Sequence, residues 1–352
     1  MDLDAFFAAV EVREDPSLAG LPLVVGGDPD GRGVVSTASY EARRFGIRSA
    51  MPAAEARRRC PHAVFVRPDM PRYRRWSAQV WDLVRDEVPV LEQVGIDEGY
   101  IDLYRQVWTA GGAHRFLARL QRAVRDETGL HASFGCGSCK TVAKIASDAD
   151  KPRGLVVVPA GREAEFLAPR PLRALPGIGP VTGERLARAG LATIGDLAAL
   201  DDTALSAVLP VAHGRELRDR ARGIDPREVD PSSSPAVTIG HETTFAHDVA
   251  DPEVLAGHAD DLAARVTERL RRDGRGAGTV TVKLRYPDFS IQSRAASAEF
   301  ATDDADEIAR LAQVALSRAL VDRPPPVRLL GVSVTRLSPV SQMIMHPGEA
   351  TP

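Results

Sequence analysis

The side chains best suited to chemistry in this sequence are carboxylates set among apolar residues in two segments. Asp2 and Asp4 flank Leu3 in MDLDAFFAAVE, and Asp97 and Glu98 are adjacent in VGIDEGYIDL. Neighbouring strand side chains point to opposite faces, so we expect one acid of the pair to face the buried side of a sheet. A buried carboxylate is costly unless it is paired or binds a metal. Carboxylates from two strands can hold two Mg²⁺ ions about 3.5–4 Å apart, as in polymerases, nucleases and nucleotidyl cyclases.

The lysines give a second signal. Only four of the 45 basic residues are lysines, and three of them, Lys140, Lys144 and Lys151, fall within one short segment. A compact ammonium on a flexible stem suits a phosphate-binding site. We interpret the cluster as phosphate-binding, with a solvated helix face as the alternative.

The elements that must position these residues alternate between strand and helix. The patterns predict strands at 21–26, 33–38, 94–103 and 131–136, and a first strand that runs into a helix over residues 1–10. Helical patterns cover 39–59, with a helix start near Pro52, and then 73–88, 114–128 and 140–149. This alternation around an acidic pair predicts an α+β core.

The rest of the chain predicts further domains, because 352 residues exceed what one core supports. Composition changes near Pro159, and residues 169–222 combine short helices with tight turns. Residues 225–236 are rich in Pro, Ser and Asp and are typical of a linker. The order β-α-β-β-α-β follows, which predicts a split βαβ domain of roughly a hundred residues.

A helix-hairpin-helix motif is indicated within residues 169–222. Gly177 and Gly179 lie in LPGIGPVTGERLARAG. Glycines let a hairpin backbone approach a phosphate, and the N–H groups at the next helix start bind it without reading sequence. The motif predicts a sequence-independent DNA contact, with a plain turn as the alternative.

Composition excludes several classes of protein. With 44% hydrophobic and 26% charged residues, no apolar run of about eighteen and no basic-then-apolar leader, we expect a cytoplasmic protein without membrane span or signal peptide. Three cysteines fit a reduced compartment, and Cys136 and Cys139 lack the second pair of a zinc site, so we interpret their spacing as coincidence. A net charge of −3 requires any nucleic-acid surface to come from charges sorted onto one face.

Four segments in this order, MDLDAFFAAVE, SYEARRFGIRSAMP, VGIDEGYIDL and KTVAKIASDADKPRGL, resemble the Y-family translesion DNA polymerases, of the bacterial DNA polymerase IV type. The resemblance implies a multidomain right-hand fold. Its parts would be a palm (1–7 and 69–158), fingers (8–68), a helix-hairpin-helix thumb (159–230), a linker (231–235), a βαββαβ little finger (236–340) and a loose tail (341–352).

The resemblance also implies roles for individual residues. The metal ligands would be Asp2, Asp97 and Glu98, helped by the Leu3 carbonyl, while Asp4 would be structural. Phe7 would exclude a ribose 2′-OH, with Phe6 beside it as a core residue of the nucleotide site, and Tyr40, Arg43 and Lys140 would hold the triphosphate. Ser36 and Ala50 would be small residues over the nascent base pair, and the DNA contacts would come from Gly177, Gly179, Arg285 and Arg294.

The function implied is template-directed, error-prone addition of dNTPs to a primer 3′-OH with two Mg²⁺ ions, without proofreading, by a monomer. A nucleotidyl cyclase, a two-metal nuclease and a non-catalytic DNA-binding accessory protein are the alternatives. Residues 342–345 (Gln342 to Met345) faintly resemble a sliding-clamp-binding peptide. Because the family's first strand has several apolar residues before its aspartate, we expect the native chain to begin earlier than Met1.

Overall fold

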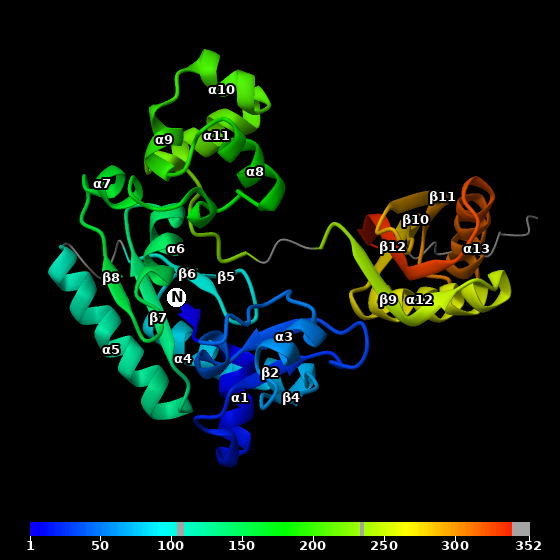
Figure 1. Ribbon diagram of the computed structural model, residues 1–352, viewed down its shortest axis with the longest axis horizontal. Helices are drawn as coiled ribbons and strands as arrows, with labels where there is room; N and C mark the ends of the chain where they lie inside the picture. Colours follow the sequence, from blue (N-terminus) through cyan, green and yellow to red (C-terminus); the bar gives the residue numbers. More distant parts are fainter. Residues whose placement is uncertain (104–108, 233–235, 340–352) are drawn as a thin grey trace, which may run out of the picture. The chain divides into compact units, whose positions relative to one another are not determined.

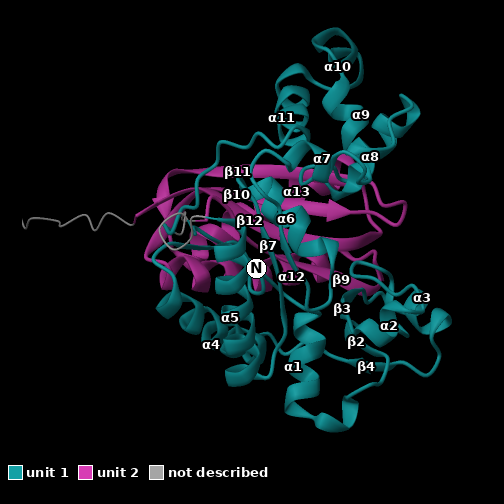
Figure 2. Ribbon diagram, turned by 90° about the vertical axis from the view of Figure 1, so that its left-hand side faces the viewer, with its two compact units in different colours: residues 1–233 teal, residues 234–352 magenta. Residues whose placement is uncertain are grey.

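The computed structural model describes residues 1–103, 109–232 and 236–339. The chain forms two compact units, Met1–Ser233 and Ser234–Pro352 (Figures 1 and 2). The predicted tail and its clamp-binding segment lie outside the described residues. None of the described helices is long and apolar enough to span a membrane.

The centre of the first unit is a small sheet in the order β1-β7-β8. Its strands are β1 (Asp2–Leu3), β7 (Ala132–Cys136) and β8 (Leu155–Val157), with β1 antiparallel and β8 parallel to β7. A separate hairpin, β5 (Leu91–Gln93) with β6 (Gly99–Ile101), meets this sheet through an isolated bridge between Asp2 and Glu98.

Helices cover both faces of β7. α4 (Met70–Glu87) packs on α5 (Ala110–Thr128), and α5 lies along β7 and β8, while α6 (Lys140–Ala149) also packs on β7. Phe134 joins the core that α5 contributes to, and the next residue, Gly135, faces α6. Since adjacent strand residues point to opposite faces, α5 and α6 lie on opposite sides of the sheet.

A smaller layer follows the first helix, α1 (Phe6–Glu14). Its sheet has the order β3-β2-β4, and a small core of its own includes Val24, Val35 and Cys60. The elements of this layer are η1 (Pro16–Leu18), β2 (Leu23–Gly26), β3 (Val35–Ala38), α2 (Tyr40–Arg43), α3 (Ala53–Arg59) and β4 (Val64–Val66).

The last part of the first unit is entirely helical, and α8 to α11 gather at one end of it (Figure 1). Its apolar core also includes three residues of α6, namely Val142, Ile145 and Ala146. The elements are α7 (Glu163–Leu167), η2 (Leu172–Ala174), α8 (Pro180–Arg188), α9 (Ile194–Ala199), α10 (Asp202–Val208) and α11 (Val211–Ala221).

The second unit is a four-stranded antiparallel sheet in the order β11-β10-β12-β9, with α12 and α13 packed on it. Buried residues alternate along β10, with Val280, Val282 and Leu284 in the core. The elements are β9 (Ile239–Val249), α12 (Pro252–Arg272), β10 (Arg275–Arg285), β11 (Ile291–Thr302), α13 (Ala305–Asp322) and β12 (Val327–Pro339).

Most of the predicted elements are present, including a helix at 140–149 and the β-α-β-β-α-β order of the second unit. The helical pattern over 39–59 forms two short helices, α2 and α3, and the strands β4, β5 and β8 were not predicted. The strand predicted over 94–103 is wrong in its first half. The N–H groups of Val94 and Gly95 both donate to the Glu98 carbonyl, which closes a turn, and β6 begins only at Gly99. Asp97 and Glu98 are therefore partly exposed loop residues, and neither is buried on a sheet face.

Candidate active site

The hairpin loop between β5 and β6 brings the three carboxylates together. The N–H of Leu3 donates to the Asp97 carbonyl at 2.9 Å, and Asp2 forms the bridge with Glu98. Leu3 itself is buried, so β1 is fixed in place beside the loop. Two segments almost a hundred residues apart thus place Asp2, Asp97 and Glu98 at one site, as the sequence predicts.

Two lysines complete this carboxylate cluster. Nζ of Lys144 donates to Oδ2 of Asp2 at 2.7 Å and to Oε2 of Glu98 at 2.6 Å. Nζ of Lys151 lies 2.6 Å from Oδ1 of Asp2 and 2.7 Å from Oδ1 of Asp148. Both oxygens of Asp2 therefore face an ammonium group.

The charges of the cluster shift its pKa values in opposite directions. Burial raises the pKa of Asp97, and the negative charges of Asp2 and Glu98 raise it further. Burial also acts to raise the pKa of Asp2, but Lys144 and Lys151 outweigh it and hold that pKa below its ordinary value. Asp97 thus experiences an excess of negative charge that another cation would relieve.

This donor set fits a hard divalent cation, because every side-chain ligand is a carboxylate oxygen. The ammonium of Lys144 already bridges Asp2 and Glu98, which shows that a cation is accommodated between them. Among the described ranges, no three His, Cys, Asp or Glu side chains form a ready-made metal cage. Asp2, Asp97 and Glu98 are the residues that would hold a metal ion here, with Lys144 as the cation that it would replace.

The position of Lys144 depends on how closely α6 packs on β7. A Cβ at Gly135 would lie 2.1 Å from both the Ala143 carbonyl oxygen and the Ser147 nitrogen, so no side chain fits there. Because Gly135 has no side chain, one turn of α6 packs directly against β7. Lys144 lies on that turn and faces Asp2 on the neighbouring strand β1.

Lys140 lies elsewhere. Its ammonium is ion-paired with Glu92 on β5 and lies 5.2 Å from the centre of the Tyr100 ring. The side chain is almost fully buried. The structure thus brings Lys144 and Lys151 to the carboxylates, while the sequence analysis assigned the triphosphate to Lys140.

Phe7 and Phe6 lie in different environments. The ring of Phe7 stacks on Tyr73 with centroids 4.2 Å apart and is partly exposed. Phe6 is only 2% exposed and packs edge-on against the same Tyr73 ring, so it is a core residue. Tyr73 is held in turn by a 2.6 Å hydrogen bond from its hydroxyl to Glu11. Phe7 is therefore a rigid, accessible ring.

Tyr40 and Arg43 form a second pair near the cluster. The Arg43 guanidinium lies 4.6 Å from the centre of the Tyr40 ring, and its Nε donates to the Ala38 carbonyl. The Tyr40 hydroxyl donates to Oδ1 of Asp4 at 3.1 Å. Asp4 also accepts from the Ser133 hydroxyl, so this buried carboxylate ties α2 to the central sheet.

Ser36 and Ala50 lie on adjoining segments. Ser36 is on β3, and the N–H of Ala50 donates to the carbonyl of Val35, the neighbour of Ser36. Ala50 is exposed and has a φ of 66°. The backbone segments that carry these two small residues therefore lie side by side.

A cavity of about 830 Å³ opens beside the carboxylate cluster, and its lining includes Glu98, Tyr100, Lys140, Lys144 and Asp225. Residues of α5, α6 and β6 contribute to its walls. Phe7, Tyr40 and Arg43 do not line it. These three residues, which the resemblance assigns to the nucleotide, therefore lie outside this cavity.

The helix-hairpin-helix glycines are exposed at the start of α8. Gly179 is the N-cap of α8, and a Cβ there would meet no atom within 4 Å. Gly177 has a φ of 99°, a conformation that L side chains rarely adopt. The backbone N–H groups that open α8 are thus accessible to a phosphate.

Arg285 and Arg294 point to opposite faces of the second unit's sheet. Arg294 pairs across the ladder with the core residue Val282, and its Nε donates to Asp322 of α13 at 2.6 Å. Arg285 follows the core residue Leu284 and so points to the face away from the helices. Its Nε is buried and has no hydrogen-bond partner in the part of the chain that the structure describes. The structure does not bring these two arginines together.

Sequence reasoning missed the separate roles of the three clustered lysines. The lysine pattern alone does not show which ammonium reaches the acids. A usable signal is KPRG, because its proline ends the segment that follows α6 and fixes where Lys151 emerges.

Comparisons with known proteins agree over nearly the whole chain. The impB/mucB/samB family model matches residues 1–148, its C-terminal domain 236–346, and the helix-hairpin-helix motif of the same family 160–191. The DNA polymerase IV of Halorhodospira halophila is 44% identical over 339 residues, which cover 96% of this chain and 94% of that protein.

Solved structures give the same result. The Y-family DNA polymerase chimera Dbh-Dpo4(243-245)-Dbh has a TM-score of 0.87 at 25% identity, covering 96% of this chain and 97% of that one. An insertion ternary complex of Dbh DNA polymerase has a TM-score of 0.65 at 25% identity, with 95% and 97% covered. The likeness extends over both units.

Proposed function

The chain belongs to the impB/mucB/samB family, the Y-family DNA polymerases, and is a template-directed DNA polymerase of the translesion type; we propose that Asp2, Asp97 and Glu98 form its catalytic centre. The observation that carries this proposal is the convergence of these carboxylates and two lysines from β1, the β5–β6 loop, α6 and the segment that follows α6. Family membership implies dependence on a divalent metal, and we propose two Mg²⁺ ions.

The proposed reaction joins a primer 3′-OH to the α-phosphorus of a dNTP. A new P–O bond forms, the bond to the β-phosphate oxygen breaks, and the hydroxyl proton leaves to solvent as pyrophosphate departs. When bound, the metal ions would lower the pKa of the attacking hydroxyl and neutralise charge on the leaving phosphate. Asp2, Asp97 and Glu98 would hold them, with the Leu3 carbonyl as a further oxygen ligand.

The lysines act on the phosphates in this proposal. When Asp2, Asp97 and Glu98 hold metal, the ammonium groups of Lys144 and Lys151 would be free to leave Asp2 and donate to phosphate oxygens. Lys151 lies against Asp2 and Asp148, while Lys140 stays ion-paired with Glu92. We therefore assign the triphosphate contact to Lys151 in place of Lys140.

The remaining nucleotide contacts come from α1 and α2. The Tyr40 hydroxyl reaches Asp4 and the Arg43 guanidinium lies over the Tyr40 ring, and both donors suit phosphate oxygens. The stacked ring of Phe7 would fill the space of a ribose 2′-OH. Ser36 and Ala50, both small, would leave room over the nascent base pair.

DNA is bound mainly through its backbone in this proposal. The backbone N–H groups at the start of α8, which Gly177 and Gly179 leave uncovered, would bind one phosphate, and Arg285 would bind another. We propose that a single chain is the active form and that it works in the cytoplasm, where template DNA lies. Sliding-clamp binding through residues 342–345 stays a prediction.

Primer extension on four templates that differ in one templating base tests the proposal. We expect incorporation of the complementary nucleotide in each case, dependent on Mg²⁺ and lost with EDTA. Incorporation that ignores the templating base, or that persists in EDTA, would contradict it.

A further inference from the structure

The start of α6 is capped from a distant part of the chain. Its own N-cap residue, Cys139, makes no side-chain capping hydrogen bond. Oδ2 of Asp225 instead accepts from the N–H of Thr141 at 3.2 Å and from its hydroxyl at 2.7 Å. Thr141 is fully buried and Asp225 is 9% exposed, so this is an internal contact. A carboxylate 84 residues away thus satisfies a free backbone donor of the helix.

Arg227 fixes the rotamer of Asp225. Its Nε lies 2.8 Å from Oδ1 and its Nη2 lies 2.6 Å from Oδ2, which is a bidentate pair. The N–H of Arg227 also donates to Oδ1. Both oxygens of Asp225 are therefore held, and one of them points at the first turn of α6.

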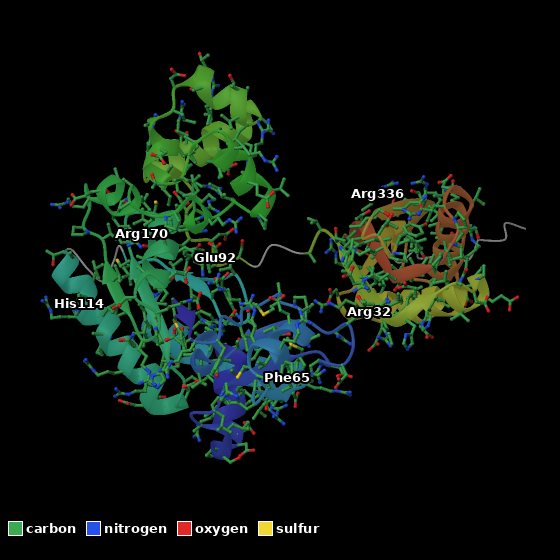
Figure 3. The ribbon with its side chains drawn as sticks, viewed as in Figure 1. Arg32, Phe65, Glu92, His114, Arg170 and Arg336 are labelled. Carbon is green, nitrogen blue, oxygen red and sulfur yellow. The ribbon has the colours of Figure 1, made fainter. Side chains whose placement is uncertain are left out.

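The same segment touches the palm at two more points. The thiol of Cys139 donates to the Gly223 carbonyl, and the N–H of Asp230 donates to Oε2 of Glu92 at 2.7 Å. Glu92, labelled in Figure 3, is also the ion-pair partner of Lys140. Residues 223–230, which we call the strap, thus lie over the beginning of α6 and the edge strand β5.

The strap is the last part of the predicted thumb and directly follows α11. α11 ends at Ala221, two residues before the strap, and its side chains belong to the same apolar core as Val142, Ile145 and Ala146 of α6. Thumb residues therefore contact α6 both at its first turn, through Asp225, and along its apolar face. Lys144 lies one turn after the capped residue Thr141, and Lys151 follows the end of the helix.

We infer that Asp225 is a positioning residue that couples the thumb to the lysines of the active site, by holding the first turn of α6 in place. A shift of α6 moves Lys144 and Lys151 relative to Asp2, and misplacements of about 1 Å cost large factors in rate. The inference rests on the proposed catalytic centre and adds a residue that contacts neither substrate nor metal.

Single-nucleotide incorporation by Asp225→Asn and Thr141→Val tests this inference. We expect KM for the dNTP to rise about tenfold in either variant, with the Kd for primer-template DNA within twofold of wild type. On a background that carries both Lys144→Ala and Lys151→Ala, Asp225→Asn is expected to add less than threefold, because it acts through the same two ammonium groups. Additive effects would overturn the inference.

Asp201→Asn is the matched control. Asp201 caps α10 within the thumb by accepting from the N–H of Ala204 at 2.8 Å. We expect Asp201→Asn to lower Tm and to leave KM for the dNTP unchanged. If both aspartate variants raise KM in step with their loss of Tm, Asp225 is merely structural. If Asp225→Asn retains the wild-type KM while Asp97→Asn is inactive, only this inference fails. If Asp97→Asn stays active, the proposed catalytic centre itself fails.

Discussion

The ammonium of Lys151 lies 2.6 Å from a carboxylate oxygen of Asp2, at the point where the proposed metal ligands meet. Lys140, eleven residues earlier, is ion-paired with Glu92. We therefore expect Lys151→Ala to raise KM for the dNTP about 30-fold, which corresponds to the loss of one charge-assisted hydrogen bond of about 2 kcal/mol. Steady-state incorporation kinetics measure this value, with Lys140→Ala as the comparison. A larger effect from Lys140→Ala would return the phosphate contact to that residue.

The stacking of Phe7 on Tyr73 predicts sugar discrimination. We expect Phe7→Ala to admit rNTPs, because removing the ring opens the space of a 2′-OH. The measurement is the ratio of kcat/KM for dCTP and CTP opposite guanine. Phe45→Ala serves as the control, since Phe45 is an exposed ring of the first unit that packs against His62. Unchanged discrimination in Phe7→Ala would remove Phe7 from this role.

The opposite orientations of Arg285 and Arg294 predict different salt dependences of DNA binding. A guanidinium that contacts a phosphate displaces a counterion, so Arg285→Ala should lower the slope of log K against log salt by about 1. Arg294 is already paired with Asp322, and its replacement by Ala should leave the slope unchanged. Fluorescence anisotropy with labelled primer-template between 50 and 300 mM salt distinguishes the two. If Arg294→Ala lowers the slope and Arg285→Ala does not, the DNA contacts the helix-covered face of the sheet instead.

The contacts of Asp225 predict how stability depends on pH. Burial acts to raise the pKa of Asp225, but hydrogen bonds from Arg227 and Thr141 outweigh it, and the pKa lies well below its ordinary value. A carboxyl group with a depressed folded-state pKa stabilises the fold above its unfolded pKa of about 3.9, and the stabilisation is lost as pH falls further. The difference in unfolding free energy between wild type and Asp225→Asn should therefore be constant from pH 6 to 8 and shrink below about pH 4. Urea unfolding at each pH measures it, and a difference that shrinks already at pH 6 would contradict this assignment.

Much of this fold could be predicted from local sequence patterns. Particular residues show where such patterns no longer predict the structure. The helix at 140–149 has a clear apolar period and was predictable, as was the β-α-β-β-α-β order. The position of Asp97 was not, because the turn that closes on the Glu98 carbonyl competes with a strand of equally apolar residues.

The lysine cluster shows a second limit of local pattern. Three lysines in one segment look alike in sequence, and their partners come from β1, β5 and the β5–β6 loop. The contacts of the strap could not be predicted from the sequence either, because the contact of Asp225 with Thr141 joins residues 84 positions apart. Local spacing carries no information about such pairs. The carboxylates stand out in the sequence because they lie among apolar residues, and the motifs that contain them resemble a known family.

The central claim is that Asp2, Asp97 and Glu98 form one catalytic metal centre. Its most direct test is single-turnover incorporation by Asp97→Asn, a nearly isosteric change that removes the charge. The control is Asp82→Asn on α4, which affects an exposed aspartate paired with Arg85. We expect the rate of Asp97→Asn to fall at least about 10³-fold at unchanged affinity for primer-template DNA, while Asp82→Asn matches wild type. Incorporation by Asp97→Asn at the wild-type rate would contradict the account.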